Sequence, residues 1–286
     1  MTTRQRLLLI RGLGHSGTTI LDMALGAHPQ ITGLGEAVRI LAQPIAGEEA
    51  RGPAQLRGEL RFQRRCTCGA IAAECPVWGS VLDWLPMNDE RPLSEKMMRL
   101  LNGVDRVHPS TTWVVDSYQD DMELPFFVDP DLEIRILYLT RDVRSWVHSR
   151  SRGGRRQRRW LPGLKPLLRW CFVNARQDLR LRLSGLPIYW LGYEQLALDP
   201  ERSLKRLCLW LDIEFDQRML KPVEYSTSHI LSGNRMRFNP SRGASISYDY
   251  DWLQINSGLA HVALFLPWLA RLNRKLVYHQ KEDMDL

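Results

Sequence analysis

The chain has 286 residues, of which 44% are hydrophobic and 25% are charged, and its formal net charge is +7 at pH 7. This composition is ordinary for a soluble protein, and the length is most simply that of one α/β domain over residues 1–286, with room for a small helical subdomain. The positive charge fits a polyanionic ligand, nucleic acid or an anionic membrane, so charge alone does not choose among these partners.

Membrane-spanning and secretory segments are not expected. No stretch approaches the roughly 20 apolar residues that a helix needs to cross a bilayer. The first apolar run, residues 7–10, ends in a glycine-rich loop and lacks the length and the cleavage site of a secretory signal. We therefore expect a cytoplasmic protein. Residues 259–272 are the most apolar late segment, and they predict a packed helix or a peripheral membrane contact.

A glycine-rich loop at residues 12–19 is the most informative motif. It reads Gly-Leu-Gly-His-Ser-Gly-Thr-Thr, follows a strand predicted over residues 7–12 and leads into a helix predicted over residues 18–27. In this context backbone N–H groups and a helix N-terminus can hold an anion, whereas a generic tight turn is the plain alternative. Thr18 stands where a nucleoside triphosphatase loop carries its lysine, which argues against phosphoryl transfer. A neutral hydroxyl suits the less charged sulfuryl group, with His15 as the available donor.

The next predicted elements are a short strand, a short helix and an insertion between strands of the sheet. Residues 31–32 predict the strand, and Glu36 begins a helical pattern that continues to residue 41. Residues 47–65 are charged and weakly periodic, which predicts an exposed segment. We expect a helical insertion over residues 47–106 that helps to line the pocket of a substrate.

Three of the five cysteines cluster within this insertion. They are Cys66, Cys68 and Cys75, in the stretches Cys-Thr-Cys-Gly and Glu-Cys-Pro-Val-Trp. The odd number of cysteines argues against a disulfide framework. A zinc site would need a fourth ligand from Cys171, Cys208 or a histidine, and the spacing is not that of a paired knuckle. We therefore predict a reduced structural cluster or one disulfide, and no metal. His229 and His261 are isolated in the sequence and receive no catalytic role.

Three further apolar segments predict buried strands, and a helix follows the last of them. The strands cover residues 112–116, 133–140 and 187–192, and the helix covers residues 200–211. This alternation predicts a single parallel β-sheet flanked by helices, an α/β fold of the P-loop-like type. Ligands of such sheets bind beyond the carboxyl ends of the strands. We therefore expect Asp116, Ser117 and Arg141 to converge with the glycine-rich loop on one crevice.

Six arginines lie between residues 150 and 159, interrupted by Gly153 and Gly154 and followed by Trp160. Such a charge run is usually a solvated surface segment, and we expect a mobile basic loop over residues 150–160. Because it follows Arg141 closely, it could also close over a bound ligand or attract an acidic substrate.

The glycine-rich loop continues to Pro29, and three later segments of the chain are informative together with it. They are residues 137–150 (Leu-Tyr-Leu-Thr-Arg-Asp-Val-Arg-Ser-Trp-Val-His-Ser-Arg), residues 193–201 (Tyr-Glu-Gln-Leu to Asp-Pro-Glu) and residues 233–238 (Gly-Asn-Arg-Met-Arg-Phe). In this order the segments resemble those of sulfotransferases that use 3′-phosphoadenosine 5′-phosphosulfate (PAPS). The resemblance is closest to the branch with tyrosylprotein and bacterial carbohydrate or metabolite sulfotransferases, because His28-Pro29 leads without a gap into Gly35-Glu36.

The resemblance implies an enzyme that moves a sulfuryl group from PAPS to an acceptor hydroxyl, leaves adenosine 3′,5′-bisphosphate (PAP) and requires no metal. It implies that Glu36 is the base on the acceptor and that His15 stabilises charge on the leaving phosphate. Arg141 would fork onto the 3′-phosphate, with Asp142 orienting it, and Ser149 would add a hydroxyl. The remaining implied contacts to PAPS come from Gly14, Ser16, Gly17, Thr18 and Thr19 of the loop, from Tyr193 beside adenine, and from Arg235 and Arg237 in a late loop.

The residues alone also allow plainer roles. Glu36 suits the first turn of any helix, Arg141 could be one half of a surface ion pair with Asp142, and Tyr193 could be a core tyrosine. A strand-end aspartate such as Asp116 may simply cap the segment that follows. Two departures from the family pattern remove a permanent positive charge: His15 replaces a lysine or arginine, and residues 116–119 read Asp-Ser-Tyr-Gln where many bacterial members read Asp-Ser-Ser-Lys.

The expected acceptor is a carbohydrate or a small-molecule metabolite, and a peptide tyrosine stays open. A basic rim mildly favours an anionic acceptor, and no nucleic-acid partner is expected. Two other functions are the alternatives. A small-molecule kinase shares the strand-loop-helix start but needs the missing lysine. A nucleic-acid-binding protein could use the arginine run and a cysteine-bound zinc, although no aromatic residues alternate with those arginines.

Overall fold

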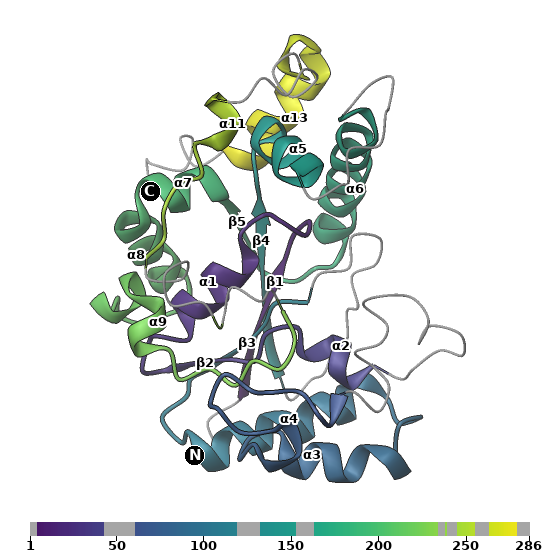
Figure 1. Ribbon diagram of the computed structural model, residues 1–286, viewed down its shortest axis with the longest axis vertical. Coiled ribbons are helices and arrows are strands. Elements are labelled where there is room, and N and C mark those ends of the chain that lie inside the picture. The colour runs from purple at the N-terminus through teal and green to yellow at the C-terminus, as the bar shows by residue number, and fades with distance from the viewer. Residues whose placement is uncertain are drawn as a thin grey trace.

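The computed structural model describes residues 5–42, 61–118, 132–152, 163–233, 238, 245–254 and 263–278. These ranges contain one five-stranded parallel β-sheet in the order β2-β3-β1-β4-β5 (Figure 1). The strands are β1 (Gln5–Arg11), β2 (Ile31–Gly33), β3 (Trp113–Asp116), β4 (Leu132–Thr140) and β5 (Ile188–Gly192). Each predicted strand is present, and the predicted α/β class with a flanked parallel sheet is confirmed.

Helices connect and cover the strands. The α-helices are α1 (Thr18–Leu25), α2 (Ala37–Leu41), α3 (Gly79–Trp84), α4 (Leu93–Val107), α5 (Val143–Arg152), α6 (Leu164–Leu183), α7 (Tyr193–Leu198), α8 (Pro200–Trp210), α9 (Pro222–Tyr225), α11 (Asp251–Gln254) and α13 (Pro267–Val277). Short 3-10 helices are η3 (Ala72–Glu74), η4 (Leu85–Met87), η5 (Gln217–Leu220) and η7 (Ala263–Phe265). None of the helices in the described ranges has the length and apolar character needed to cross a bilayer.

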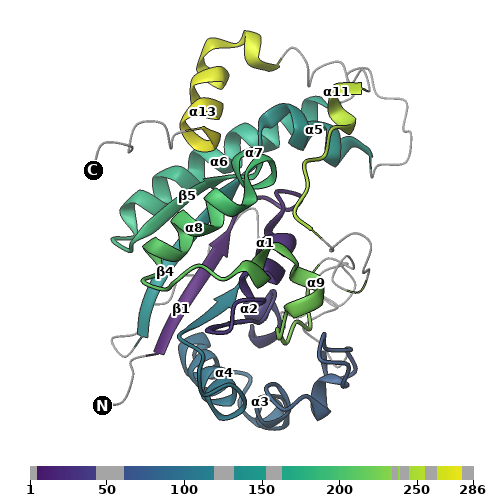
Figure 2. The same cartoon turned by 90° about the vertical axis from the view of Figure 1, so that its left-hand side faces the viewer.

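The two faces of the sheet bury alternate residues of the same strands. Leu7 and Leu9 of β1 join a core with α2, α3 and α4, whereas Leu8 and Ile10 join a second core with α1, α7 and α8. Burial on both faces explains why these strands read as continuous apolar runs. Figure 1 shows α1, α7, α8 and α9 together on one side of the strands. A third core unites α5, α6 and α13, which Figures 1 and 2 place at the opposite end of the molecule from α3 and α4.

The predicted exposed segment over residues 47–65 is described only from residue 61 onward, where Gln63 and Arg65 are exposed as predicted but Arg61 is not. Arg61 is buried and pairs with Asp89, whose carboxylate also accepts a hydrogen bond from the buried Lys96. The helices that follow pack on the sheet. The expected helical insertion is therefore helical, but its described part belongs to the core.

The basic run and the late apolar segment are only partly described. Helix α5 continues through Arg152, so residues 150–152 are helical and do not belong to a loop, while residues 153–162 lie outside the described ranges. Of the segment 259–272, the part from residue 263 onward forms η7 and α13. Leu269 is buried there, whereas Phe265 and Trp268 are exposed. A packed helix is thus confirmed for this part, and a peripheral membrane contact stays a prediction.

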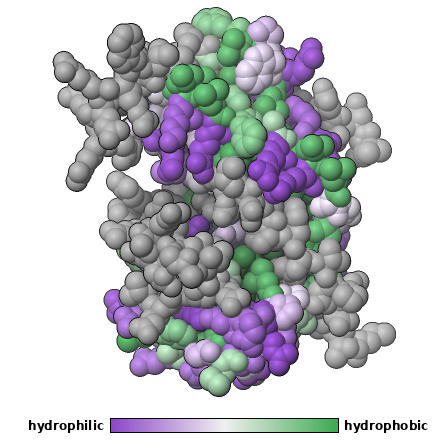
Figure 3. All heavy atoms as spheres, turned by 90° about the vertical axis from the view of Figure 1, so that its right-hand side faces the viewer, coloured by the Kyte–Doolittle hydropathy of each residue, from purple (hydrophilic) through white to green (hydrophobic). Residues whose placement is uncertain are grey.

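The face that carries α6 also exposes large hydrophobic residues. They are Leu168, Phe172, Leu179 and Leu183 on that helix. Figure 3 looks onto this side of the molecule and shows hydrophobic residues interspersed with hydrophilic ones over the described surface.

The three clustered cysteines also lie close together in the structure, with a residue that we expected to be isolated. Cys66, Cys68 and Cys75 are free thiols, and the side chain of His229 lies among them. His229 is therefore not isolated in the structure, its lack of a catalytic role stays a prediction, and His261 lies outside the described residues.

Candidate active site at the carboxyl edge of the sheet

The carboxyl ends of all five strands meet at one edge of the sheet because the strands are parallel. Residues predicted for the site follow every one of these ends. The glycine-rich loop follows β1, Glu36 lies beyond β2, Ser117 follows β3, Arg141 follows β4 and Tyr193 follows β5. Asp116, Ser117, Arg141 and the loop thus lie at the same edge of the sheet, and their convergence on one crevice stays a prediction.

The glycine-rich loop has the backbone geometry of an anion cradle. His15 and Gly17 have φ angles of 74° and 94°, and backbone of this kind can gather N–H groups around an anion. The N–H of Ser16 closes the turn by donating to the carbonyl of Leu13 at 3.0 Å. Gly17 then caps α1, whose first residue is Thr18.

Thr18 carries the most informative orphaned atom of the loop. Its side chain is buried, and its Oγ1 has no hydrogen-bond partner among the described residues. A buried hydroxyl without a partner costs free energy on the order of 1–3 kcal/mol, which a ligand oxygen would recover. The loop around it is suited to hold such an oxygen, and this side chain fills the place of the absent lysine.

Gly17 offers a direct test of the loop. A Cβ atom at this position would lie 2.7 Å from Cδ2 of Tyr193, in a backbone conformation that side chains rarely adopt. We expect Gly17→Ala to displace Tyr193 or the loop and to weaken PAP binding at least tenfold in calorimetry. Gly185→Ala is the matched control, because Gly185 also has a positive φ of 71° but nothing within 4 Å of its Cβ position. Equal PAP affinity in the two variants would contradict this expectation.

Arg141 is held against the loop by a set of polar contacts. It is 6% exposed, its Nε donates to Ser145 Oγ at 2.9 Å and its Nη1 donates to the carbonyl of His15 at 3.3 Å. Its Nη2 pairs with Asp249 at 3.1 Å, and its guanidinium lies 4.6 Å from the ring centre of Tyr193. The alternative of a surface ion pair is therefore wrong for Arg141, which lies inside the site.

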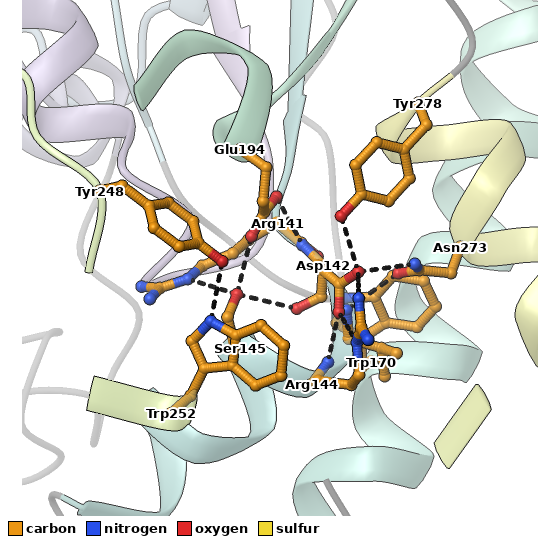
Figure 4. Close-up of polar contacts among 11 residues, drawn as sticks. Arg141, Asp142, Arg144, Ser145, Trp170, Glu194, Tyr248, Trp252, Asn273 and Tyr278 are labelled. Atoms are coloured by element: carbon orange, nitrogen blue, oxygen red, sulfur yellow. Dashed lines mark hydrogen bonds and ion pairs between the residues drawn. The ribbon is translucent and has the colours of Figure 1, made fainter. Parts of the chain in front are cut away.

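Asp142 does not orient Arg141 as we predicted. Its carboxylate instead binds Arg144, Asn273 and Tyr278, and this cluster is visible in Figure 4. The pKa of Asp142 lies below its usual value; burial acts against this shift, and the hydrogen bond and charge of Arg144 outweigh it. Asp142 thus fixes helix α5 to α13, the last of the described helices.

Glu194 is a site residue that our reading of the sequence missed. It is buried and accepts hydrogen bonds from the N–H of Asp142 at 2.9 Å and from Ser145 Oγ at 2.8 Å (Figure 4). Burial raises the pKa of Glu194 to about 7, an effect that the charge of Asp142 strengthens. Because Ser145 in turn accepts from Arg141, Glu194 positions that arginine. The signal was available: Glu194, like Glu36, is a charged residue in the first turn after a buried strand.

Glu36 lies at the N-terminus of α2, beyond the carboxyl end of β2. It is 7% exposed, and its Oε2 accepts hydrogen bonds from Arg39 at 2.6 Å and from Ser232 Oγ at 3.0 Å. Its N–H donates to the carbonyl of Ser232 at 3.0 Å, so both main chain and side chain are tied to the segment 226–233. Arg39 and Ser232 thus hold the carboxylate of Glu36 in place.

Arg11 is a second residue that we missed. It is fully buried at the end of β1, and its Nη1 pairs with Asp116 Oδ2 at 2.8 Å. The other oxygen of Asp116 accepts from the N–H of Val38 in the earlier helix α2. The capping of the following segment that we left open is the contact from the N–H of Tyr118 to Asp116 Oδ2 at 3.3 Å. Arg11 is a permanently charged residue directly before the glycine-rich loop, whereas His15 within the loop is not permanently charged. An arginine at the end of an apolar strand was the signal.

The remaining predicted site residues lie in the loop, on α5, after β3 or outside the described ranges. Gly14 and Thr19 are half-buried in the loop, and the carbonyl of Gly14 accepts from Trp146 Nε1 at 2.8 Å. Ser149 is half-buried on α5, one residue before Arg150, whose guanidinium lies 3.0 Å from His15 Nε2. Ser117 donates to Asp22, and burial raises the pKa of Asp22 to about 7. Arg235 and Arg237 lie outside the described residues.

Comparisons with known proteins agree with this architecture. A sequence model described as the sulfotransferase family matches residues 8–217. The chain is similar to a solved sulfotransferase domain from the curacin biosynthetic pathway, with a TM-score of 0.51, 18% identity and coverage of 97% of this chain and 98% of the other. This likeness supports the fold. No curated protein matches the chain.

Two further solved structures are more distant. The sulfotransferase domain of the Synechococcus PCC 7002 olefin synthase has a TM-score of 0.49 and 16% identity, covering 96% of this chain and 95% of the other. A retinol dehydratase, solved in complex with androsterone and the inactive cofactor PAP, has a TM-score of 0.34 and 15% identity, covering 98% of this chain and 82% of the other. The family match spans most of the sheet and the candidate site, and on that evidence this chain belongs to the sulfotransferase family.

Proposed function

We propose that this protein transfers a sulfuryl group from PAPS to a hydroxyl of a carbohydrate or a small-molecule metabolite. The observation that carries the proposal is the buried Thr18 hydroxyl without a partner, in a loop whose main chain Arg141 also contacts. An oxyanion needs hydroxyl, amide and guanidinium donors together, and this edge of the sheet supplies all three.

The residues of the site fit the two charged ends of PAPS. The loop from Gly14 to Thr19 would bind the 5′ end through main-chain amides and hydroxyls. Arg141 would bind the 3′-phosphate, supported by Ser149, and would exchange its contact with Asp249 for the phosphate. Tyr193 packs on Gly17 and under Arg141, so it supports both groups whether or not it also touches adenine. Arg235 and Arg237 are proposed as further phosphate contacts.

PAPS, when bound, supplies the activated sulfuryl group. Glu36 then acts as the base: its carboxylate accepts the proton of the acceptor hydroxyl as that oxygen becomes the nucleophile. His15, at the exposed tip of the loop, donates a hydrogen bond to the phosphate that carries the departing charge. Arg150 adds positive charge beside the loop and compensates in part for the missing lysine, whereas Asp116 balances the charge of the buried Arg11. None of these steps calls for a metal ion.

A kinase is disfavoured by the same residues. Thr18 is buried in the position of the phosphate-binding lysine, so no ammonium group can extend from there to a terminal phosphate. We propose a carbohydrate or a small-molecule metabolite as the acceptor. A basic rim that includes Arg150 favours an anionic acceptor.

Calorimetry with PAP and transfer of radiolabelled sulfate from PAPS test this function. We expect PAP to bind with equal affinity in the presence of Mg²⁺ and of a chelator, and label to appear on a hydroxyl in a library of sugars and metabolites. Tight binding of ATP that depends on Mg²⁺, with no binding of PAP, would show that the protein is a kinase instead. Binding of oligonucleotides that weakens with salt, again without PAP, would support the nucleic-acid alternative.

A further inference from the structure

Three thiols and one imidazole converge on a single point. The ligating atoms of Cys66, Cys68, Cys75 and His229 all lie within 4.8 Å of one another. Cys66, Cys75 and His229 are buried, whereas Cys68 is exposed. The three cysteines come from the segment before α3, and the histidine comes from the segment that follows α9.

Four of the distances between these atoms are close to the edges of a tetrahedron around a zinc ion. Zn–S bonds of about 2.3 Å and Zn–N bonds of about 2.0–2.1 Å place two sulfurs ~3.75 Å apart and a sulfur and a nitrogen ~3.6 Å apart. The Sγ of Cys75 lies 3.6 Å from that of Cys66 and 3.8 Å from that of Cys68. Nδ1 of His229 lies 3.2 Å from Cys75 Sγ and 3.9 Å from Cys66 Sγ.

The imidazole of His229 is held in an orientation that suits a ligand. Its Nε2 lies 2.8 Å from Nε2 of His108, and its ring is packed against that of His108 at 5.0 Å. Donation of the Nε2 proton to His108 leaves Nδ1 with a lone pair that faces the sulfurs. A ligating histidine commonly gives its second N–H to a neighbouring acceptor in this way. The main chain of His229 is fixed as well, because its carbonyl accepts from Trp78 Nε1 at 2.7 Å.

A disulfide accounts for less of this arrangement. Its sulfurs would be about 2.05 Å apart, and it would leave the third thiol and the histidine without a shared purpose. The cysteine segment is instead folded as a chelating turn. The N–H of Gly69 donates to the carbonyl of Cys66 at 3.0 Å, and Gly69 adopts a φ of 95°.

We propose that Cys66, Cys68, Cys75 and His229 bind a structural Zn²⁺ ion. The three thiols release their protons to solvent, the imidazole binds as the neutral base, and no group is oxidised or reduced. Four protein ligands leave no open position on the ion, so it takes no part in sulfuryl transfer.

The site joins two segments that are distant in the sequence, and one of them holds the proposed base. Thr67 Oγ1 donates to the carbonyl of Ser228 and accepts from the N–H of Ile230 at 2.9 Å, which reinforces the same junction. Three residues beyond His229, Ser232 binds Glu36. In Figure 1 the segment that contains His229 and Ser232 runs from α9 past α1 and β2 toward α2. The zinc ion therefore fixes the segment 226–233, to which Glu36 is bound.

Metal analysis of the full chain, purified without chelator or added metal, tests the proposal. We expect about one zinc per chain in the unaltered protein and less than 0.2 in Cys68→Ser. Cys68 is the chosen position because its exposure makes the folded state tolerant of the change. Cys208→Ser is the matched control, since this buried thiol lies outside the cluster, and it should retain the zinc. His108→Ala should keep the ligands but weaken zinc affinity 10–100-fold.

Two further measurements distinguish zinc from other outcomes. Replacement by Co²⁺ should give the sulfur-to-metal charge-transfer and visible bands of a tetrahedral S₃N site, and these should disappear in Cys68→Ser. Removal of zinc by a chelator should lower the thermal midpoint of the unaltered protein by more than 5 °C, with PAP binding measured separately. Zinc below 0.2 per chain in the unaltered protein, a mass 2 Da below that of the fully reduced chain, or the same zinc content in Cys68→Ser would overturn the proposal.

Discussion

Glu36→Gln should reduce turnover by about 10²- to 10⁴-fold while PAP affinity stays within twofold of the unaltered protein. The amide has the shape of the carboxylate and can still accept the hydrogen bond from Ser232, but it cannot take a proton from the acceptor. Single-turnover measurements with saturating PAPS and acceptor separate this loss from a loss of binding. Such a split between binding and chemistry is the expected signature of a general base.

The Glu36 variant also loses its ion pair with Arg39, so a structural cause must be separated from a chemical one. Arg39→Gln removes the same ion pair and leaves the carboxylate in place, so it should retain most of the activity. Glu201→Gln, which breaks the exposed pair with Lys205 on α8, controls for a change of charge alone. If Glu36→Gln turns over as fast as Glu201→Gln, Glu36 is not the base.

Arg141→Ala should weaken PAP binding by 100-fold or more. A hydrogen bond between charged groups contributes roughly 1.5–3 kcal/mol, and about 1.4 kcal/mol corresponds to a tenfold change in affinity, so losing a two-pronged contact accounts for this factor. The guanidinium is held by Ser145 and by the carbonyl of His15, and it therefore needs little reorganisation to receive a phosphate. Calorimetric titration with PAP gives the affinity directly.

The control for Arg141 is its ion-pair partner. Asp249→Asn removes the negative charge that occupies Nη2 but leaves the guanidinium intact, so PAP affinity should be unchanged or tighter. Thermal unfolding of both variants reports any general loss of structure. Were Asp249→Asn to lose PAP affinity as strongly as Arg141→Ala, the arginine would act through the ion pair, and its assignment to the 3′-phosphate would fail.

The positions of the site residues were predictable because they follow from strand ends. Each parallel strand is a short apolar run that stops at a charged, hydroxyl or glycine residue, as at Thr140 followed by Arg141. Such a run identifies a buried strand, and parallel pairing then brings all its stopping points to one edge. Nothing beyond local sequence is needed for that step.

The partners of those residues were not predictable in the same way. Asp142 and Arg141 are adjacent in the chain, yet Asp142 binds Asn273, which is 131 positions away. His229 meets Cys75 across 154 positions. Contacts of this kind depend on how helices and connecting segments cross over the sheet. They cannot be predicted from the spacing of residues within one segment. Glu194 shows the intermediate case, because its place after a strand was readable whereas its hydrogen bonds to Asp142 and Ser145 were not.

The carboxylate of Asp142 has a practical consequence for anyone who shortens this protein. Two of its partners are Asn273 in α13 and Tyr278 directly after that helix, and Asn273 also accepts from the N–H of Val143 at the start of α5. A shortened protein that ends before residue 267 would lose both of these partners of Asp142, which should loosen α5 beside Arg141 even though all five strands would still be encoded. Expression designs should therefore keep the carboxyl-terminal helix intact.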